Sequence, residues 1–436
     1  MNIFPALAIA MAALGARAAD APLPYDARAK HLGVVNCASS LCHGSIGEWK
    51  GSNVLQNEYV TWSRVDKHAL RASQVLRNDR SKRIAANLGL ATPAHEAKIC
   101  IDCHGHNPPS ANRGERFKAS DGVSCEACHG PAERWIGPHV APGATHAENL
   151  RNGLYPTEDP VALARLCLSC HFGNKDKFVT HRMMGAGHPR ISFELDTFTQ
   201  TQPPHFVVDE DWRRRKGSWD GVRVWAIGQA LAAQESLDVV LDPKRGRDGL
   251  FPELVVFDCH ACHHPMSETR WKPRAGTRPG TIRFNDANLL MLRQIVRQVF
   301  PGDSSAFNDL VMRFHKAVAG EGGDAQESAL QLHKGLDSVV AKLRARDFGE
   351  RDLRAILAGL VEDGLAGQFG DYAGAEQATM AIASVLDFLA RRGEIADVRA
   401  ARGALDGVFE AVKDDEKYRR ERFVSALALL KTTLAR

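Results

Sequence analysis

The chain lacks several features that would assign it to common classes of protein. Apart from a short apolar stretch near the N-terminus, none of its 436 residues form the run of roughly eighteen apolar residues that a transmembrane helix needs. No basic run is interleaved with aromatic residues, so nothing supports nucleic-acid binding. The net charge of +4 indicates no particular partner. The length suggests two domains.

Aromatic residues are also scarce, and cysteine is unevenly distributed. Phe, Trp and Tyr make up 7% of the chain, which is little for a core of this size. All ten cysteines lie before residue 263, and eight of them belong to one repeated pattern, C-x-x-C-H. The four copies are CIDCH (100–104), CEACH (125–129), CLSCH (167–171) and CHACH (259–263).

This spacing is the attachment signal for c-type haem. Residues i, i+3 and i+4 share one side of a helical turn, so both thiols reach the two vinyl groups on one porphyrin edge. The histidine that follows then ligates the iron. Roughly one random chain in a hundred of this composition would contain a single copy, so four copies predict haem. The alternative is zinc, but zinc ribbons do not require histidine after every cysteine pair.

The two remaining cysteines, Cys37 and Cys42, read C-A-S-S-L-C-H, which is C-x4-C-H. We interpret this segment as a fifth haem site with a looped-out linker; a disulfide or two free thiols is the alternative. Five porphyrins would add the apolar bulk that the few aromatics do not supply. The predicted attachment thiols are Cys37, Cys42, Cys100, Cys103, Cys125, Cys128, Cys167, Cys170, Cys259 and Cys262, and the predicted proximal iron ligands are His43, His104, His129, His171 and His263.

The N-terminus predicts export from the cytoplasm. A short apolar run over 3–14 is followed by Ala16-Arg17-Ala18, which fits an A-x-A cleavage site. Residues 1–19 are therefore predicted to be a signal peptide, with an uncleaved anchor as the alternative. Because c-type haem is attached outside the cytoplasm, a bacterial periplasm is the simplest destination.

The rest of the chain predicts a mainly α protein in two parts. Residues 20–284 are rich in Gly, Pro and Asn and show few long periodic runs, which predicts short helices and loops wrapped around covalent haems. Residues 285–436 contain no cysteine and show helical periodicity, for example at Leu353, Ile356 and Leu360. We expect an all-α bundle of five to seven helices that caps the haem domain, or that serves docking or dimerisation.

Two segments resemble the cytochrome c-554-like family of multihaem cytochromes. CHGSIGEWKGSNVLQNEYVTWSRVDKHA (42–69) resembles the opening haem segment of that family, and DGVSCEACHGP (121–131) is similar to its third. The resemblance implies a mainly helical periplasmic protein with closely stacked haem pairs that passes electrons, with relatives that oxidise hydroxylamine. It also implies that His68 is the distal ligand of the His129 haem, and that His139, or else His146, serves the His43 haem.

The remaining distal ligands are less evident from the sequence. His181 and His188 lie in one glycine-containing turn and are expected to serve the His171 and His263 haems, in either order. Met183 and Met184 are rival ligands, although core packing is their expected role. The His104 haem is left without a clear partner, and the resemblance implies an open face there. His95, His106 and His205 are candidates to close it, and His260 is a candidate ligand of a neighbouring haem.

These features favour an electron carrier that passes electrons along its haems between redox partner proteins. The alternative is a haem-dependent oxidoreductase that acts on hydroxylamine, nitrite, nitric oxide or a small sulfur compound at a five-coordinate iron. No C-x-x-C-K is present, so the lysine-ligated haem of pentahaem nitrite reductases is absent. A membrane-bound or respiratory complex, docked through the helical bundle, is a third context. No catalytic side chain is predicted.

Overall fold

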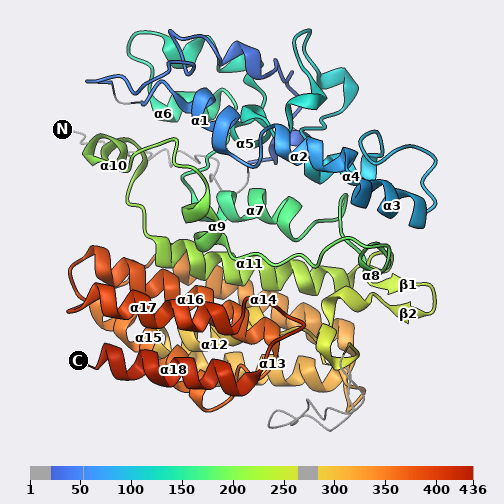
Figure 1. Ribbon diagram of the computed structural model, residues 1–436, viewed down its shortest axis with the longest axis vertical. Coiled ribbons are helices and arrows are strands. Elements are labelled where there is room, and N and C mark those ends of the chain that lie inside the picture. Colours follow the sequence, from blue (N-terminus) through green and yellow to red (C-terminus); the bar gives the residue numbers. More distant parts are fainter. Residues whose placement is uncertain (1–20, 53, 264–282, 436) are drawn as a thin grey trace, which may run out of the picture.

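The computed structural model describes residues 21–52, 54–263 and 283–435. Within these ranges the chain is mainly helical with one antiparallel two-stranded sheet, which confirms the predicted fold class. Figure 1 shows two layers: short helices and long loops at one end, and a bundle of long helices at the other. The predicted signal peptide, 1–19, lies outside the described residues. Among the described helices, none has the length and apolar character needed to cross a membrane.

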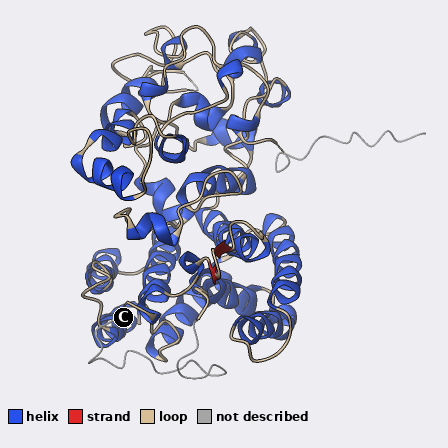
Figure 2. Ribbon diagram, turned by 90° about the vertical axis from the view of Figure 1, so that its right-hand side faces the viewer, coloured by secondary structure: helices blue, strands red, loops and turns tan. Residues whose placement is uncertain are grey.

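The first layer holds short helices separated by loops. Glycine and proline interrupt this part of the chain repeatedly, which keeps its helices short. Its α-helices are α1 (Glu58–Val65), α2 (Leu70–Gln74), α3 (Asp79–Asn87), α4 (Lys98–His104), α5 (Cys125–His129), α6 (His146–Arg151), α7 (Pro160–His171), α8 (His181–Gly185), α9 (Leu195–Thr201) and α10 (Glu210–Lys216). The hairpin of β1 (Arg247–Asp248) and β2 (Phe251–Pro252) follows later in the chain, and Figure 2 shows it among the helices.

The second layer consists of longer helices. They are α11 (Gly221–Leu241), α12 (Ala287–Val299), α13 (Ser304–Val318), α14 (Ala325–Arg344), α15 (Glu350–Leu365), α16 (Tyr372–Arg391), α17 (Val398–Ala411) and α18 (Arg420–Leu434). Seven of them follow residue 285, within the predicted range of five to seven. The apolar face predicted from Leu353, Ile356 and Leu360 is fully buried in α15, as a one-sided helix on a core requires.

Helix α11 joins the two predicted domains through one continuous core. It precedes the predicted boundary at residue 285, yet Trp225, Ile227 and Leu237 are fully buried in the same cluster as bundle residues such as Leu386. The periodicity argument missed this helix because it is apolar around nearly its whole circumference and so shows no single apolar face. The boundary remains a prediction, but no break in packing accompanies it.

Close packing and specific bonds fix the haem-motif layer on the bundle. Helix α9 approaches α11 at Gly228, where an added Cβ would lie 2.7 Å from the Cβ of Leu195. Arg344 of α14 bonds to Asp159 (2.8 Å), which also caps α7 by accepting from two backbone amides. The Gln377 side chain of α16 donates to the Phe193 carbonyl (3.0 Å). These contacts hold α7 and α9, which border the candidate site.

Candidate haem-binding site

Three of the four C-x-x-C-H motifs end helices, and the last one, CHACH, begins in a 3-10 turn. The motif histidine is the last residue of α4, α5 and α7, so the two cysteines of each motif occupy the preceding helical turn. The fourth motif begins in the turn η10 (Cys259–Ala261), where the amide of His263 bonds to the Cys259 carbonyl (2.8 Å). In each case the local fold places both thiols and the histidine close together, as one porphyrin edge requires.

The expanded first motif forms a surface turn. The amides of Cys42 and Gly44 both bond to the Ser39 carbonyl (2.9 Å each), and the amide of His43 bonds to that of Cys37 (3.2 Å). Ser39, Ser40 and Leu41 are exposed. The extra residues therefore bulge outward, and His43 still follows the second thiol directly.

Each of the five motif histidines faces a second histidine from elsewhere in the chain. The distance between ring centres is nearly constant over all five pairs. The pairs are His43–His139 (6.3 Å), His68–His171 (6.0 Å), His104–His188 (6.3 Å), His129–His205 (6.3 Å) and His181–His263 (6.2 Å).

This constant separation fits an iron atom between the rings. A metal–imidazole nitrogen bond is about 2.0–2.1 Å, and the ring centre lies roughly 1.1–1.2 Å beyond the nitrogen, so two rings on opposite sides of one metal ion would be about 6.2–6.6 Å apart, close to the distances found here. The interplanar angles range from 12° to 86°. Ring stacking alone would not give one distance at such different angles.

Hydrogen bonds at Nδ1 leave Nε2 available in several of these histidines. Nδ1 of His43 lies 2.9 Å from Oε2 of Glu58, and Nδ1 of His68 lies 3.1 Å from Oδ1 of Asp66. Because an ionised carboxylate only accepts, each ring carries its proton on Nδ1 and presents a lone pair at Nε2. Metal-binding histidines are oriented in this way by their partners.

Backbone carbonyls have the same role at three other rings. Nδ1 of His139 lies 2.7 Å from the Ile136 carbonyl, and Nδ1 of His188 lies 2.8 Å from that of Pro189. The corresponding distance from His205 to the Pro203 carbonyl is 3.5 Å, a weaker contact. All three rings therefore have Nε2 on the side away from the carbonyl.

Burial and hydrogen bonding shift the pKa values of the site in different directions, and the hydrogen bond to Glu58 raises the pKa of His43. Burial lowers the pKa of His129 to about 3 and that of His171 to about 4, so both rings are neutral at pH 7. Burial acts to raise the pKa of Asp66, but hydrogen bonds from His68 and Gln202 outweigh it and bring that pKa to about 2. A neutral imidazole is the form that binds a metal.

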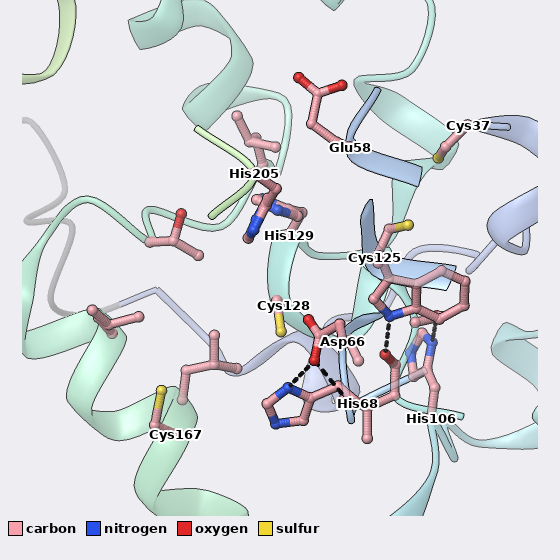
Figure 3. Close-up of a pocket in the computed structure, with 18 of the residues that line it drawn as sticks. Cys37, Glu58, Asp66, His68, His106, Cys125, Cys128, His129, Cys167 and His205 are labelled. Atoms are coloured by element: carbon pink, nitrogen blue, oxygen red, sulfur yellow. Dashed lines mark hydrogen bonds and ion pairs between the residues drawn. The ribbon is translucent and has the colours of Figure 1, made fainter. Parts of the chain in front are cut away.

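A single large cavity joins three of the five histidine pairs. Its volume is about 1340 Å³, which exceeds the ~300–1,000 Å³ of a pocket for one small molecule. Figure 3 shows the thiols of Cys37, Cys125, Cys128 and Cys167 among the side chains that line it. The lining includes seven cysteines and these histidines of the pairs: His43, His68, His129, His139, His171 and His205.

The cavity also brings thiols of different motifs together. The thiols of Cys37 in the C-x4-C-H motif and Cys125 in CEACH lie close enough to shift each other's pKa, and so do those of Cys103 in CIDCH and Cys170 in CLSCH. Porphyrins attached at these thiols would have neighbouring edges. In the described part of the chain, no group of three or more His, Cys, Asp or Glu side chains forms a metal site by itself, so no four-ligand zinc site is built there.

The structure corrects two of the expected pairings. His68 faces His171 and not His129. His129 instead faces His205, which was considered only for the His104 site. No local pattern marks His205, because only the packing of α9 on the bundle brings its segment to α5.

Two further expectations concern the turn that contains His181 and His188. His181 faces His263, as one of the two predicted orders required. His188 faces His104, the site for which the sequence indicated no clear second ligand, and does not face His171. Met183 is buried at 6% exposure, in agreement with a packing role.

The rings of His139 and His146, the two candidates for the His43 haem, lie in different surroundings. His139 faces His43. His146 lies on α6, and its Nε2 is 2.7 Å from Oε1 of Glu158. This arrangement favours His139 as the second ligand. His106, another candidate, bonds through Nδ1 to the Ser124 hydroxyl (2.7 Å) and faces His31.

Comparison with known proteins agrees with this site. The model of the family described as cytochrome c554 and c-prime matches residues 36–130, a segment that contains the first three motifs, the expanded one included. The resemblance to the cytochrome c554-like family is therefore confirmed over that segment, which carries the haem-binding part of a c-type cytochrome. Such cytochromes bind haem c covalently. No curated protein and no solved structure matched the chain.

Proposed function

We propose that the protein is a pentahaem c-type cytochrome that transfers electrons between redox partner proteins. One observation carries this proposal: all five histidines that directly follow a cysteine pair face a second histidine at 6.0–6.3 Å. Haem c supplies one-electron redox chemistry when bound, and the ten thiols and ten facing histidines are the groups that would hold five copies of it.

The protein side chains have an orienting function in this proposal. Acceptors at Nδ1 orient at least one ring in four of the five pairs and leave its Nε2 available toward the partner ring. The contacts between Cys37 and Cys125 and between Cys103 and Cys170 support two close haem–haem contacts along which electrons pass. No side-chain acid or base is required for this activity.

The alternative function, an oxidoreductase at an open iron, receives less support. An iron that binds nitric oxide, nitrite or hydroxylamine needs one free coordination position. Each of the five motif histidines has an imidazole opposite it, including His104, where the family resemblance implies an open face. This arrangement favours the carrier.

The proposed location is the bacterial periplasm. The reasons are that haem c is attached outside the cytoplasm and that a short apolar run precedes an A-x-A sequence at 16–18. Docking to a membrane-bound or respiratory complex through the helical bundle is a compatible context.

Haem content and spin state test the proposed function. Intact mass and a haem assay should give five covalent haems, and electron paramagnetic resonance of the oxidised protein should show only low-spin iron. Replacement of both Cys37 and Cys42 by Ala should lower the haem count by one. Colourless protein, or a mass equal to that of the bare chain, would overturn the proposal, and an unchanged count in the double variant would remove the first site.

A further inference from the structure

Helix α1 carries a carboxylate at each end, and each one bonds to a different facing histidine. Glu58 is the first residue of the helix, and its Oε2 lies 2.9 Å from Nδ1 of His43. Asp66 directly follows the last residue, and its Oδ1 lies 3.1 Å from Nδ1 of His68. Figure 3 shows both carboxylates at the cavity. A helix of eight residues therefore connects two of the five proposed irons.

Both carboxylates are held in place by other bonds. Oε1 of Glu58 accepts from the Leu55 amide (3.0 Å), while its other oxygen faces His43. Oδ2 of Asp66 accepts from Gln202 (3.1 Å), and Oδ1 also accepts from the His68 amide (2.9 Å). The Asp66 side chain is only 5% exposed and that of Glu58 17%. Little solvent competes for these oxygens, so the two contacts are well defined.

The helix itself is anchored to the haem motifs. The indole nitrogen of Trp62 donates to the Val123 carbonyl (3.1 Å), two residues before Cys125. The amide of Tyr59 donates to the His43 carbonyl (2.9 Å). Motion of α1 relative to its two histidines is thereby restricted at both ends.

A carboxylate affects a coordinated imidazole differently from a backbone carbonyl. It attracts the Nδ1 proton more strongly, because a hydrogen bond to an ionised acceptor is roughly twice as strong as a neutral one. More electron density then remains on Nε2, which makes the ring a stronger donor to the metal. A stronger donor stabilises ferric over ferrous iron and lowers the reduction potential. The rings of His139, His188 and His205 bond to carbonyls.

We propose that Glu58 and Asp66 are positioning residues that lower the reduction potentials of the two haems held by the His43–His139 and His68–His171 pairs. This inference rests on the proposed function. It makes α1 a single element that sets the potentials of two haems. At two of the other pairs, His188 and His205 bond to backbone carbonyls, which leave these rings weaker donors.

The test uses the full-length protein with its haems. Glu58→Gln and Asp66→Asn each keep an oxygen near Nδ1 but remove its charge. In a spectroelectrochemical titration, each variant should raise the reduction potential of one haem by about 59 mV. At a fixed applied potential, this shift changes the ratio of reduced to oxidised haem about tenfold. The other four potentials should stay in place.

A matched control separates the hydrogen bond from simple loss of charge. Glu158 lines the same cavity and bonds to a histidine, His146, that faces no motif histidine. Glu158→Gln should therefore leave all five potentials unchanged. Equal shifts in this variant would overturn the inference, because loss of any nearby charge would then suffice.

Two more results distinguish the inference from the proposed function. Wild-type protein without haem would end the proposed function, whereas intact haem content with unchanged potentials in both variants would overturn only the inference. If Glu58→Gln does not fold and take up its haems, Glu58→Asp is the second variant. The shorter Asp side chain keeps the negative charge but places the carboxylate farther from Nδ1 of His43. That variant should raise the same potential, and an unchanged titration would contradict the role of the hydrogen bond.

Discussion

The imidazole of His188 faces that of His104 with 6.3 Å between ring centres, so the second imidazole of the CIDCH motif comes from the loop after α8. His188 follows α8, and its Nδ1 bonds to the Pro189 carbonyl (2.8 Å), which leaves Nε2 toward His104. The site for which the sequence indicated no clear second ligand is thus built like the other four. This relationship distinguishes a carrier from an enzyme more directly than any other contact in the molecule.

Removal of His188 should open one iron. His188→Ala leaves the thioether bonds and His104 in place, so one haem of the five should become five-coordinate. Electron paramagnetic resonance should then show high-spin iron, and added nitric oxide should bind to it. His95→Ala is the control, since His95 was a rival for this site but contacts Glu96 (3.5 Å). A wholly low-spin His188→Ala variant would contradict the assignment.

The His129–His205 pair predicts a shift in potential. His205→Met replaces the weaker-bonded imidazole with a thioether, which raises the potential of a haem that keeps one histidine. In a redox titration we expect the reduction potential of one haem to rise by at least about 59 mV, which is a tenfold change in its ratio of reduced to oxidised form.

His146→Met is the matched comparison for that prediction. His146 bonds to Glu158 and faces no motif histidine, so all potentials should remain as in the wild type. If His146→Met raises one haem potential and His205→Met leaves all five unchanged, then His146 is an iron ligand and the contact between His146 and Glu158 does not describe the haem-loaded protein.

The sequence predicts local features of this protein well and long-range pairings poorly. His43, His104 and His129 follow from adjacency to their cysteines, because covalent attachment fixes their spacing along the chain. The partner ring is set by tertiary packing, and no spacing rule applies to it. His205 was therefore not assigned to His129, although the residue itself had been noted.

The same distinction applies to the helices. The apolar faces of α13 and α15 repeat with helical period because one side of each helix meets solvent. Helix α11 is covered on nearly all sides, so its sequence shows no such period and its central place in the core was not predicted. Figure 1 shows it on the side of the bundle that faces the first layer.

Glu126 is predicted to stabilise the contact between the first and third motifs. Its carboxylate is 1% exposed and accepts from the backbone amides of Leu32, Gly33 and Ala132 at 2.7–2.8 Å. Glu126→Gln replaces one oxygen with an NH₂ group that cannot accept, so at least one buried amide loses its partner. The free energy of unfolding should fall by about 1–3 kcal/mol, measured by denaturant titration.

Glu133→Gln provides the comparison for Glu126. Glu133 accepts from the Lys30 amide at 2.9 Å on the exposed surface, where water can replace it. Loss of this hydrogen bond in Glu133→Gln should lower the free energy of unfolding by less than about 0.5 kcal/mol. If both variants lose a similar amount of unfolding free energy, burial does not make the hydrogen bonds of Glu126 more stabilising than the exposed one of Glu133.

The continuous core predicts that both parts of the molecule unfold together. Leu237 of α11 is fully buried in the cluster that includes bundle residues. Leu237→Ala leaves a cavity and should cost about 2–5 kcal/mol in the free energy of unfolding. Haem absorbance and far-ultraviolet circular dichroism should report the same shifted transition, because α11 also packs on α7 and α9.

Leu429→Ala on α18, at a position 60% exposed, should change the stability by less than about 0.5 kcal/mol. Two separate transitions in Leu237→Ala, with the haem signal unmoved, would show that residues 20–284 fold independently of the bundle.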